Sequence, residues 1–121
     1  MMERHEKRHN HRFQVSLPIT FTGKDTGIGI VRNLSKGGCQ MESMAEITSR
    51  DSIVMHLTLS PHEAPLLIQA ASVRRCNEHL FSVAFLVMDT TEQQRLREYL
   101  SKLEQRGTKW VPRDGGNNDG S

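Results

Sequence analysis

The chain has 121 residues, of which 36% are hydrophobic and 25% are charged, and its formal net charge is +2. This length suits a single domain with one modest core, and the charge is weaker than the clustered excess of a nucleic-acid-coating protein. We expect no membrane span and no secretory signal, because no run of about 18 apolar residues occurs and the N-terminus is charged.

The cysteines and histidines indicate neither a disulfide framework nor a zinc site. Cys39 and Cys76 form no C-x-x-C pair, which is typical of a reducing compartment, so we expect a cytoplasmic protein. His5, His9 and His11 match no structural zinc spacing with them, so we expect no metal and no cofactor. The catalytic signatures G-x-S-x-G, Walker lysine and H-E-x-x-H are absent, and we expect no enzymatic activity.

The first predicted strand covers residues 13–22. Its polar residues alternate without a break with the apolar Phe13, Val15, Leu17, Ile19 and Phe21. A period of two describes a strand with one buried face. Because Pro18 cannot donate a ladder hydrogen bond, we expect an edge or a bulge at that position.

Five further strands are predicted along the chain, separated by short turns rich in Gly, Asn, Ser and Pro. They cover residues 26–34, 39–42, 53–60, 66–75 and 81–87. Six strands with short links and no intervening helix predict a mainly β fold, an antiparallel barrel or sandwich.

A helix is predicted after Asp89, where the apolar period changes. Leu96, Tyr99, Leu100 and Leu103 fall on one stripe at spacings of three and four. A capping box fits in either of two registers, Thr90 with Gln93 or Thr91 with Gln94, and Gly107 is a natural stop. We expect this helix to cover an open part of the barrel.

The predicted organisation has three parts. Residues 1–12 form a flexible basic arm, and residues 13–106 form the strands and the helix. Residues 107–121 are rich in Gly, Asn and Asp, and we expect them to be a disordered tail.

Two short motifs carry the functional information. Arg8 and Arg12 form an R-x-x-x-R immediately before the first strand, and Asn33, Ser35 and Gly38 form an N-x-S-x-x-G between two apolar stretches. Alone, the first is usually a solvated charge pair, and the second an Asx-type turn. Their order and their strand context together predict a ligand site.

The residue types of both motifs suit a guanine nucleotide with phosphates. One Arg fork can satisfy the O6 and N7 acceptors of guanine, grip a phosphate or lie on a purine face. The Asn33 carbonyl can accept from guanine N1–H or N2–H2, and Ser35 adds a small donor and acceptor. Gly38 lets the backbone turn sharply and a ligand approach closely.

These residues resemble the PilZ domain, a bacterial receptor domain for cyclic di-GMP. Its signatures are R-x-x-x-R at the N-terminal edge and [D/N]-x-S-x-x-G after the second strand, and the apolar segment 81–85 and the closing helix are also similar. The resemblance covers roughly residues 4–105 and implies a six-stranded antiparallel barrel of Greek-key, split-barrel type with a C-terminal helix.

The resemblance implies that cyclic di-GMP is the ligand, bound by Arg8, Arg12, Asn33, Ser35 and Gly38. The arm would fold across the ligand, and its new conformation would be relayed to a downstream protein partner. Auxiliary contacts are expected from the following residues of the arm and the strands: Arg4, Lys7, His9, Asn10, His11, Arg32 and Gly37. Arg4 with Arg8 also satisfies R-x-x-x-R, but Arg8 with Arg12 directly precedes the strand.

Two other functions fit parts of the same pattern. The main alternative is a PilZ-like protein–protein adaptor that has the barrel but binds no ligand, in which the complete motif set would have no purpose. A barrel that binds single-stranded nucleic acid would need stacking aromatics beside basic strand residues. Here Phe13, Phe21, Phe81 and Phe85 fall on apolar stripes, so we expect no nucleic-acid partner.

Overall fold

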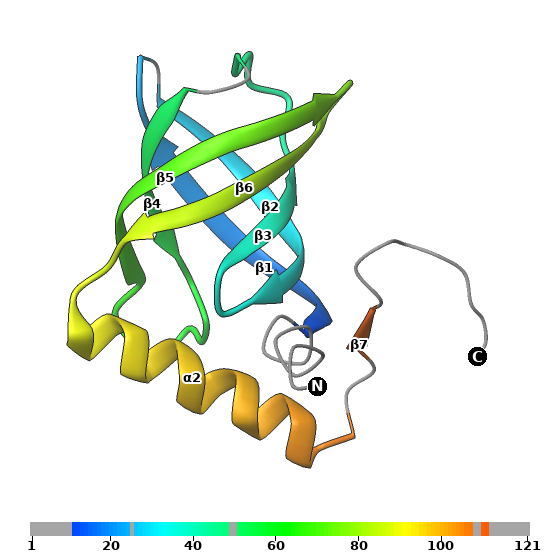
Figure 1. Ribbon diagram of the computed structural model, residues 1–121, viewed down its shortest axis with the longest axis vertical. Helices are drawn as coiled ribbons and strands as arrows, with labels where there is room; N and C mark the ends of the chain where they lie inside the picture. Colours follow the sequence, from blue (N-terminus) through cyan, green and yellow to red (C-terminus); the bar gives the residue numbers. More distant parts are fainter. Residues whose placement is uncertain (1–10, 25, 49–50, 108–109, 112–121) are drawn as a thin grey trace, which may run out of the picture.

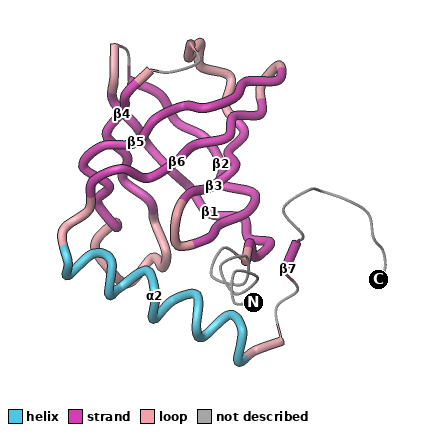
Figure 2. Tube along the Cα trace, in the orientation of Figure 1, coloured by secondary structure: helices cyan, strands magenta, loops and turns pink. Residues whose placement is uncertain are grey.

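The computed structural model describes residues 11–24, 26–48, 51–107 and 110–111. Six antiparallel strands form a barrel, and one helix lies across one of its ends (Figures 1 and 2). The elements are β1 (Arg12–Thr22), β2 (Thr26–Ser35), β3 (Gly38–Glu42), β4 (Ser52–Leu57), β5 (Leu66–Asn77), β6 (Leu80–Val87), α2 (Thr90–Gln105) and the short β7 (Trp110–Val111).

The sheet closes on itself, so the fold is a barrel and not a sandwich. The strand order is β2-β3-β6-β5-β4-β1, and β1 also pairs with β2. Strand β4 lies beside β1 after the consecutive strands β1, β2 and β3, which is the Greek-key order 4-1-2-3. The predicted Greek-key barrel with a C-terminal helix is confirmed.

The core lies inside the barrel and consists mainly of aliphatic and Met side chains. Met41, Met55 and Leu57 are fully buried, as are the larger rings Phe21 and Phe81. Along β1 the outward-facing residues are exposed and the inward-facing ones are buried or half-buried, as the period of two predicts.

Pro18 lies just beyond the end of a pairing. Strand β4 pairs with β1 only from Ile19 to Thr22, so the residue that lacks an N–H lies outside the β1–β4 ladder. The Pro18 carbonyl still accepts from the Thr58 N–H at 3.0 Å. The bulge against β2 lies earlier, between Gln14 and Leu17.

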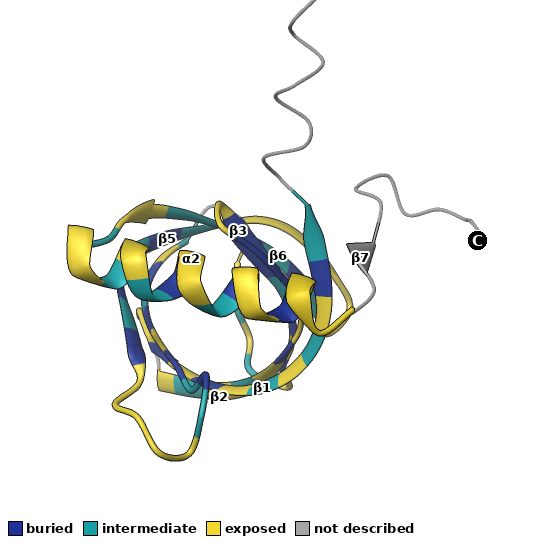
Figure 3. Ribbon diagram, turned by 90° about the horizontal axis from the view of Figure 1, so that it is seen from below, coloured by how far each residue is buried: buried dark blue, intermediate teal, exposed yellow. Residues whose placement is uncertain are grey.

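Helix α2 crosses the mouth of the barrel, with its buried residues turned toward the strands (Figure 3). Leu96, Leu100 and Leu103 are the buried positions. The predicted capping box is wrong, because Asp89 is the N-cap and makes no side-chain cap bond. Gln93 instead donates to the Met88 carbonyl at 2.8 Å.

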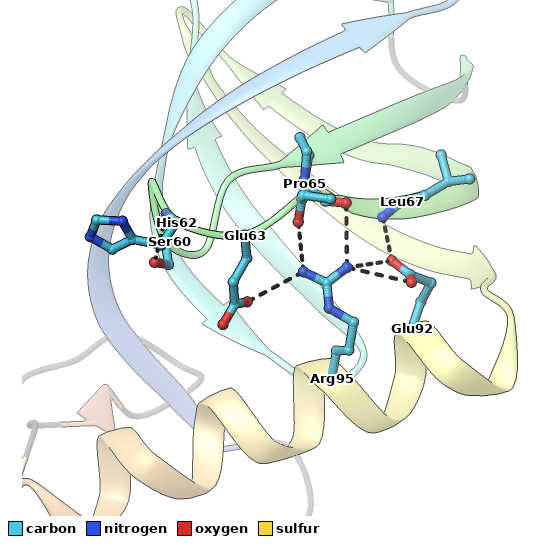
Figure 4. Close-up of polar contacts among 8 residues, drawn as sticks. Ser60, His62, Glu63, Pro65, Leu67, Glu92 and Arg95 are labelled. Carbon is cyan, nitrogen blue, oxygen red and sulfur yellow. Dashed lines mark hydrogen bonds and ion pairs between the residues drawn. The ribbon is translucent and has the colours of Figure 1, made fainter.

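Arg95 holds α2 against the link between β4 and β5 (Figure 4). Its guanidinium donates to the Ala64 carbonyl at 2.6 Å and reaches the Glu63 carboxylate at 3.4 Å. Glu92 completes the anchor, since it accepts from Arg95 at 3.2 Å and from the Leu67 N–H at 2.8 Å. These contacts fix the position of the helix relative to the barrel mouth.

The structure describes only parts of the predicted arm and tail, so the three-part division stays a prediction. Strand β1 begins at Arg12, so this residue belongs to the barrel; residues 1–10 of the predicted arm lie outside the described residues. In the predicted tail, Trp110 and Val111 form β7 and pair with Phe13 and Arg12. Apart from Gly107, the rest of the tail lies outside the described residues.

Gly38 is required by the packing of β3 on β6. A Cβ atom at this position would lie far inside van der Waals contact of the Val83 carbonyl oxygen. The two backbones approach this closely because Gly38 pairs with Ala84, at the start of the β3–β6 ladder.

We therefore expect Gly38→Ala to lower the free energy of unfolding by about 2–3 kcal/mol, since backbone must shift to make room. Urea denaturation checks this. Lys36→Ala, exposed in the adjoining turn, is the control and should leave the midpoint near that of the wild type. An unchanged midpoint for Gly38→Ala would show that β3 and β6 tolerate a side chain there.

Cys39, the neighbour of Gly38 on β3, is a buried free thiol, whereas Cys76 is an exposed one. Burial raises the pKa of Cys39 from 9.0 to about 12, and the nearby Arg12 charge lowers it by a smaller amount. The folded protein therefore keeps this thiol protonated over the whole neutral range.

Two outcomes follow for Cys39. Only Cys76 should react rapidly with Ellman's reagent in the native protein, and both thiols should react in guanidinium chloride.

Above about pH 9 the unfolded Cys39 thiol ionises while the folded one stays protonated, so the free energy of unfolding should fall toward pH 12. Cys39→Ala should remove that part of the pH dependence; an equally steep decline in Cys39→Ala would refute the assignment.

Candidate functional site

The two sequence motifs meet through one side-chain hydrogen bond. Arg12, the first residue of β1, donates from Nη1 to Oδ1 of Asn33 on β2 at 2.8 Å, and the two residues are 21 positions apart in the sequence. Asn33 is the register partner of Gln14, two residues after Arg12. Strand β1 begins and strand β2 ends at the end of the barrel that carries α2 (Figure 1). The structure therefore brings together one residue of each motif.

Asn33 is held from its other side by Gln40 of β3. Its Nδ2 donates to Gln40 Oε1 at 2.7 Å. An amide has two N–H donors and two acceptor lone pairs, so the bonds to Arg12 and Gln40 use half of that capacity. The amide is consequently oriented by two neighbours and keeps hydrogen-bonding capacity for a third group.

Polar residues continue from Gln40 across the next two strands. Ser82 of β6 is the register partner of Gln40, and Arg75 of β5 is the register partner of Ser82. Directly opposed residues lie on the same face of a sheet, and neighbouring strands are about 4.8 Å apart. Arg12, Asn33, Gln40, Ser82 and Arg75 thus form a polar row on the outer wall, with a cation at each end.

Gln40 and Ser82 were not predicted from the sequence as site residues. Each is one polar residue within a short apolar strand, and the alternation indicates only that it faces outward. Their alignment with Asn33 depends on β3 pairing with both β2 and β6. Only the strand order of the closed barrel carries that information.

Ser35 shapes the turn between β2 and β3. It is 3% exposed, and its Oγ donates to the Gly38 carbonyl and accepts from the Gly37 N–H, both at 3.3 Å. The Gly37 carbonyl in turn accepts from the Phe85 N–H of β6 at 2.9 Å. Ser35, Gly37 and Gly38 therefore fix the turn that presents Asn33, whatever else they contact.

Arg32 is paired within the barrel wall. Its Nε lies 2.8 Å from Glu42 Oε1, and both side chains are about half exposed. This ion pair neutralises the cation that was expected to serve as an auxiliary contact. Its role in ligand binding stays a prediction.

The structure describes two of the predicted arm residues. Arg4, Lys7, Arg8, His9 and Asn10 lie outside the described residues. Of the arm, the structure describes His11, which lines a hollow between the start of β1 and α2, and Arg12. The R-x-x-x-R motif is thus represented by its second arginine.

The electrostatics around Arg12 favour an anion. Its charge is felt by the buried Cys39 thiol, whose pKa it lowers against the larger effect of burial. A guanidinium fork beside an oriented amide is suited to a base edge or a phosphate.

The described ranges contain no cluster of three His, Cys, Asp or Glu side chains that could hold a metal ion. They also contain no helix with the length and hydropathy of a membrane span.

Comparisons with known proteins place the fold. The family model of the PilZ domain matches residues 6–102, whereas no curated protein matches the chain. Among solved structures, the Bacillus subtilis inhibitor of motility, MotI/DgrA, is similar with a TM-score of 0.70 and 18% identity, over 82% of this chain and 52% of that one. This chain therefore spans about half the length of that protein.

A second similar structure is the PilZ domain of CeSA from a cellulose-synthesizing bacterium. Its TM-score is 0.62 at 16% identity, over 78% of this chain and 98% of that one. Identities this low show the fold alone, but the family model covers most of the chain. PilZ domains are receptor and adaptor domains of cyclic di-GMP signalling and not enzymes. The chain described here belongs to the PilZ domain family.

Proposed function

We propose that this protein is a receptor for cyclic di-GMP that relays the second-messenger signal from the cytoplasm to a protein partner. The observation that carries the proposal is the contact between Arg12 and Asn33, which joins the two family motifs at one rim of the barrel. A barrel that served only as an adaptor would not need a guanidinium fork oriented by an amide at that rim.

Each residue of the site has a chemical role in this proposal. The Arg12 fork binds the O6 and N7 edge of one guanine or a phosphodiester. Asn33 accepts from the guanine N1–H or N2–H2 through the Oδ1 that Arg12 already orients. Arg8 supplies a second fork from the arm, and Ser35 and Gly38 hold the turn at the rim.

The relay begins at Arg12, because this residue has two connections. Its side chain contacts Asn33, and its backbone pairs with Val111 of β7. A ligand that binds Arg8 and Arg12 would order the arm and pull on the start of β1, which changes the surface that a partner meets. The ligand shifts this equilibrium only by its difference in affinity for the two arm conformations.

Isothermal titration calorimetry with cyclic di-GMP tests the proposal. We expect saturable binding to the wild type, and a loss of about tenfold or more for Arg12→Lys, which keeps the charge but loses the fork. Asn33→Ala should also weaken binding, whereas Lys24→Ala, exposed beyond the far end of β1, should not. Thermal melting establishes that each variant is folded.

The only tryptophan of the chain gives a second readout. Trp110 pairs through its backbone with Phe13, next to Arg12, so saturation with cyclic di-GMP should change its fluorescence. If the folded wild type gives no heat at tens of micromolar protein, the receptor proposal is wrong. The ligand-free adaptor would then be favoured by a protein partner that binds equally well with and without the nucleotide, and equally well to the wild type and to Arg12→Lys.

A further inference from the structure

A groove separates α2 from the turn between β2 and β3. It consists of two hollows, of about 230 Å³ and about 300 Å³. The smaller hollow begins at His11, at the root of the arm, and is lined by Phe13 and Leu100. The larger one runs toward the start of the helix and is lined by Phe85 and Met88. Both hollows are open to solvent, and the smaller one adjoins Arg12, because the residues on either side of Arg12 line it.

Two cations, Lys36 and Arg97, line both hollows and therefore stand between them. Lys36 is the variable residue after Ser35 in the N-x-S-x-x-G motif, and Arg97 comes from α2. Both are exposed. The groove thus brings a side chain of one ligand motif opposite a helix that belongs to neither motif.

Neither cation is neutralised by a carboxylate within the part of the chain that the structure describes. Arg97 donates to the neutral Gln94 amide oxygen at 3.3 Å, and Lys36 makes no side-chain hydrogen bond or ion pair there. By contrast, Arg32 and Arg95 are both paired with glutamates. Lys36 and Arg97 therefore produce a local positive potential at the centre of the groove.

The pattern along the groove is apolar, cationic and apolar. Phosphate is the natural ligand of two adjacent cations, and aromatic and aliphatic side chains suit the faces of nucleobases. Glu104 also lines the smaller hollow, and its carboxylate can accept from the N1–H and N2–H2 donors of guanine. The order of apolar, cationic and apolar side chains along the groove therefore matches the order of base, phosphate and base in a guanine dinucleotide.

We propose that Lys36 and Arg97 bind a phosphate of the guanine dinucleotide, so that α2 forms a further wall of the ligand site. This inference rests on the proposed function and adds a subsite outside both motifs. It also gives the helix a direct connection to the ligand, since Arg97 lies one residue after the buried Leu96 and close to the Arg95 anchor.

Charge-removing variants with matched controls test the subsite. Lys36→Gln and Arg97→Gln should each weaken cyclic di-GMP binding about tenfold in calorimetry. The controls remove the same charge elsewhere: Lys24→Gln at the opposite end of the barrel, and Lys102→Gln on α2 but outside this groove. The controls should bind within about twofold of the wild type.

The dependence on salt gives a readout that a structural role would not change. Between low and high salt the wild type should lose more affinity than Lys36→Gln or Arg97→Gln, because those variants lack a screened phosphate contact. Melting temperatures near that of the wild type are expected, since both side chains are exposed.

The outcomes separate this inference from the receptor proposal. If Arg12→Lys loses binding but Lys36→Gln and Arg97→Gln bind like the wild type, the groove is no subsite and the receptor stands. Equal losses of affinity in the Lys24→Gln and Lys102→Gln controls would show that net charge causes the effect, and would overturn the inference. If the folded wild type binds no cyclic di-GMP, both proposals are wrong.

Discussion

The structure depends on how β1 closes the barrel. This strand pairs with β2 along most of its length and with β4 over Ile19–Thr22, so the first and fourth strands become neighbours. An isolated hairpin of β1 and β2 would be marginal in water. Closure gives all six strands a shared interior for their apolar faces, and it leaves the start of β1 free to pair with β7.

The same closure determines where polar side chains meet. Arg12 reaches Asn33 because β1 and β2 are paired, and Asn33 reaches Gln40 because β2 and β3 are paired. Strand β6 then continues the row to Ser82, and β5 to Arg75. The outer wall of the closed barrel thereby brings together side chains from five strands that span residues 12 to 82 of the sequence.

The N-x-S-x-x-G motif divides into two kinds of residue. Ser35 is buried and uses its hydroxyl in hydrogen bonds within the turn. Gly38 allows the backbones of β3 and β6 to approach each other closely. Asn33 and Lys36 instead point outward, one toward the polar row and the other toward the groove of α2. A motif that is described as a ligand signature is therefore also a device for building the rim.

The sequence by itself determined the class of the fold and most of its elements. Alternation and the turns between apolar runs placed the six strands, and the stripe of Leu96, Leu100 and Leu103 placed the helix, because these signals arise within single segments. The motifs likewise named Arg12 and Asn33, since residue type and spacing are local. The N-cap residue Asp89 was not predicted, because either of two capping boxes fitted the same sequence.

Only the tertiary structure decided which of these segments meet. The choice of barrel over sandwich, the pairing of Trp110 and Val111 with β1 and the row through Gln40 all depend on strand order, which no local period encodes. The groove between Lys36 and Arg97 depends in addition on the Arg95 anchor that sets α2 across the barrel mouth. Contacts between distant segments depend on how the whole apolar surface is buried at once. The sequence of a single segment therefore does not determine which distant segment it meets.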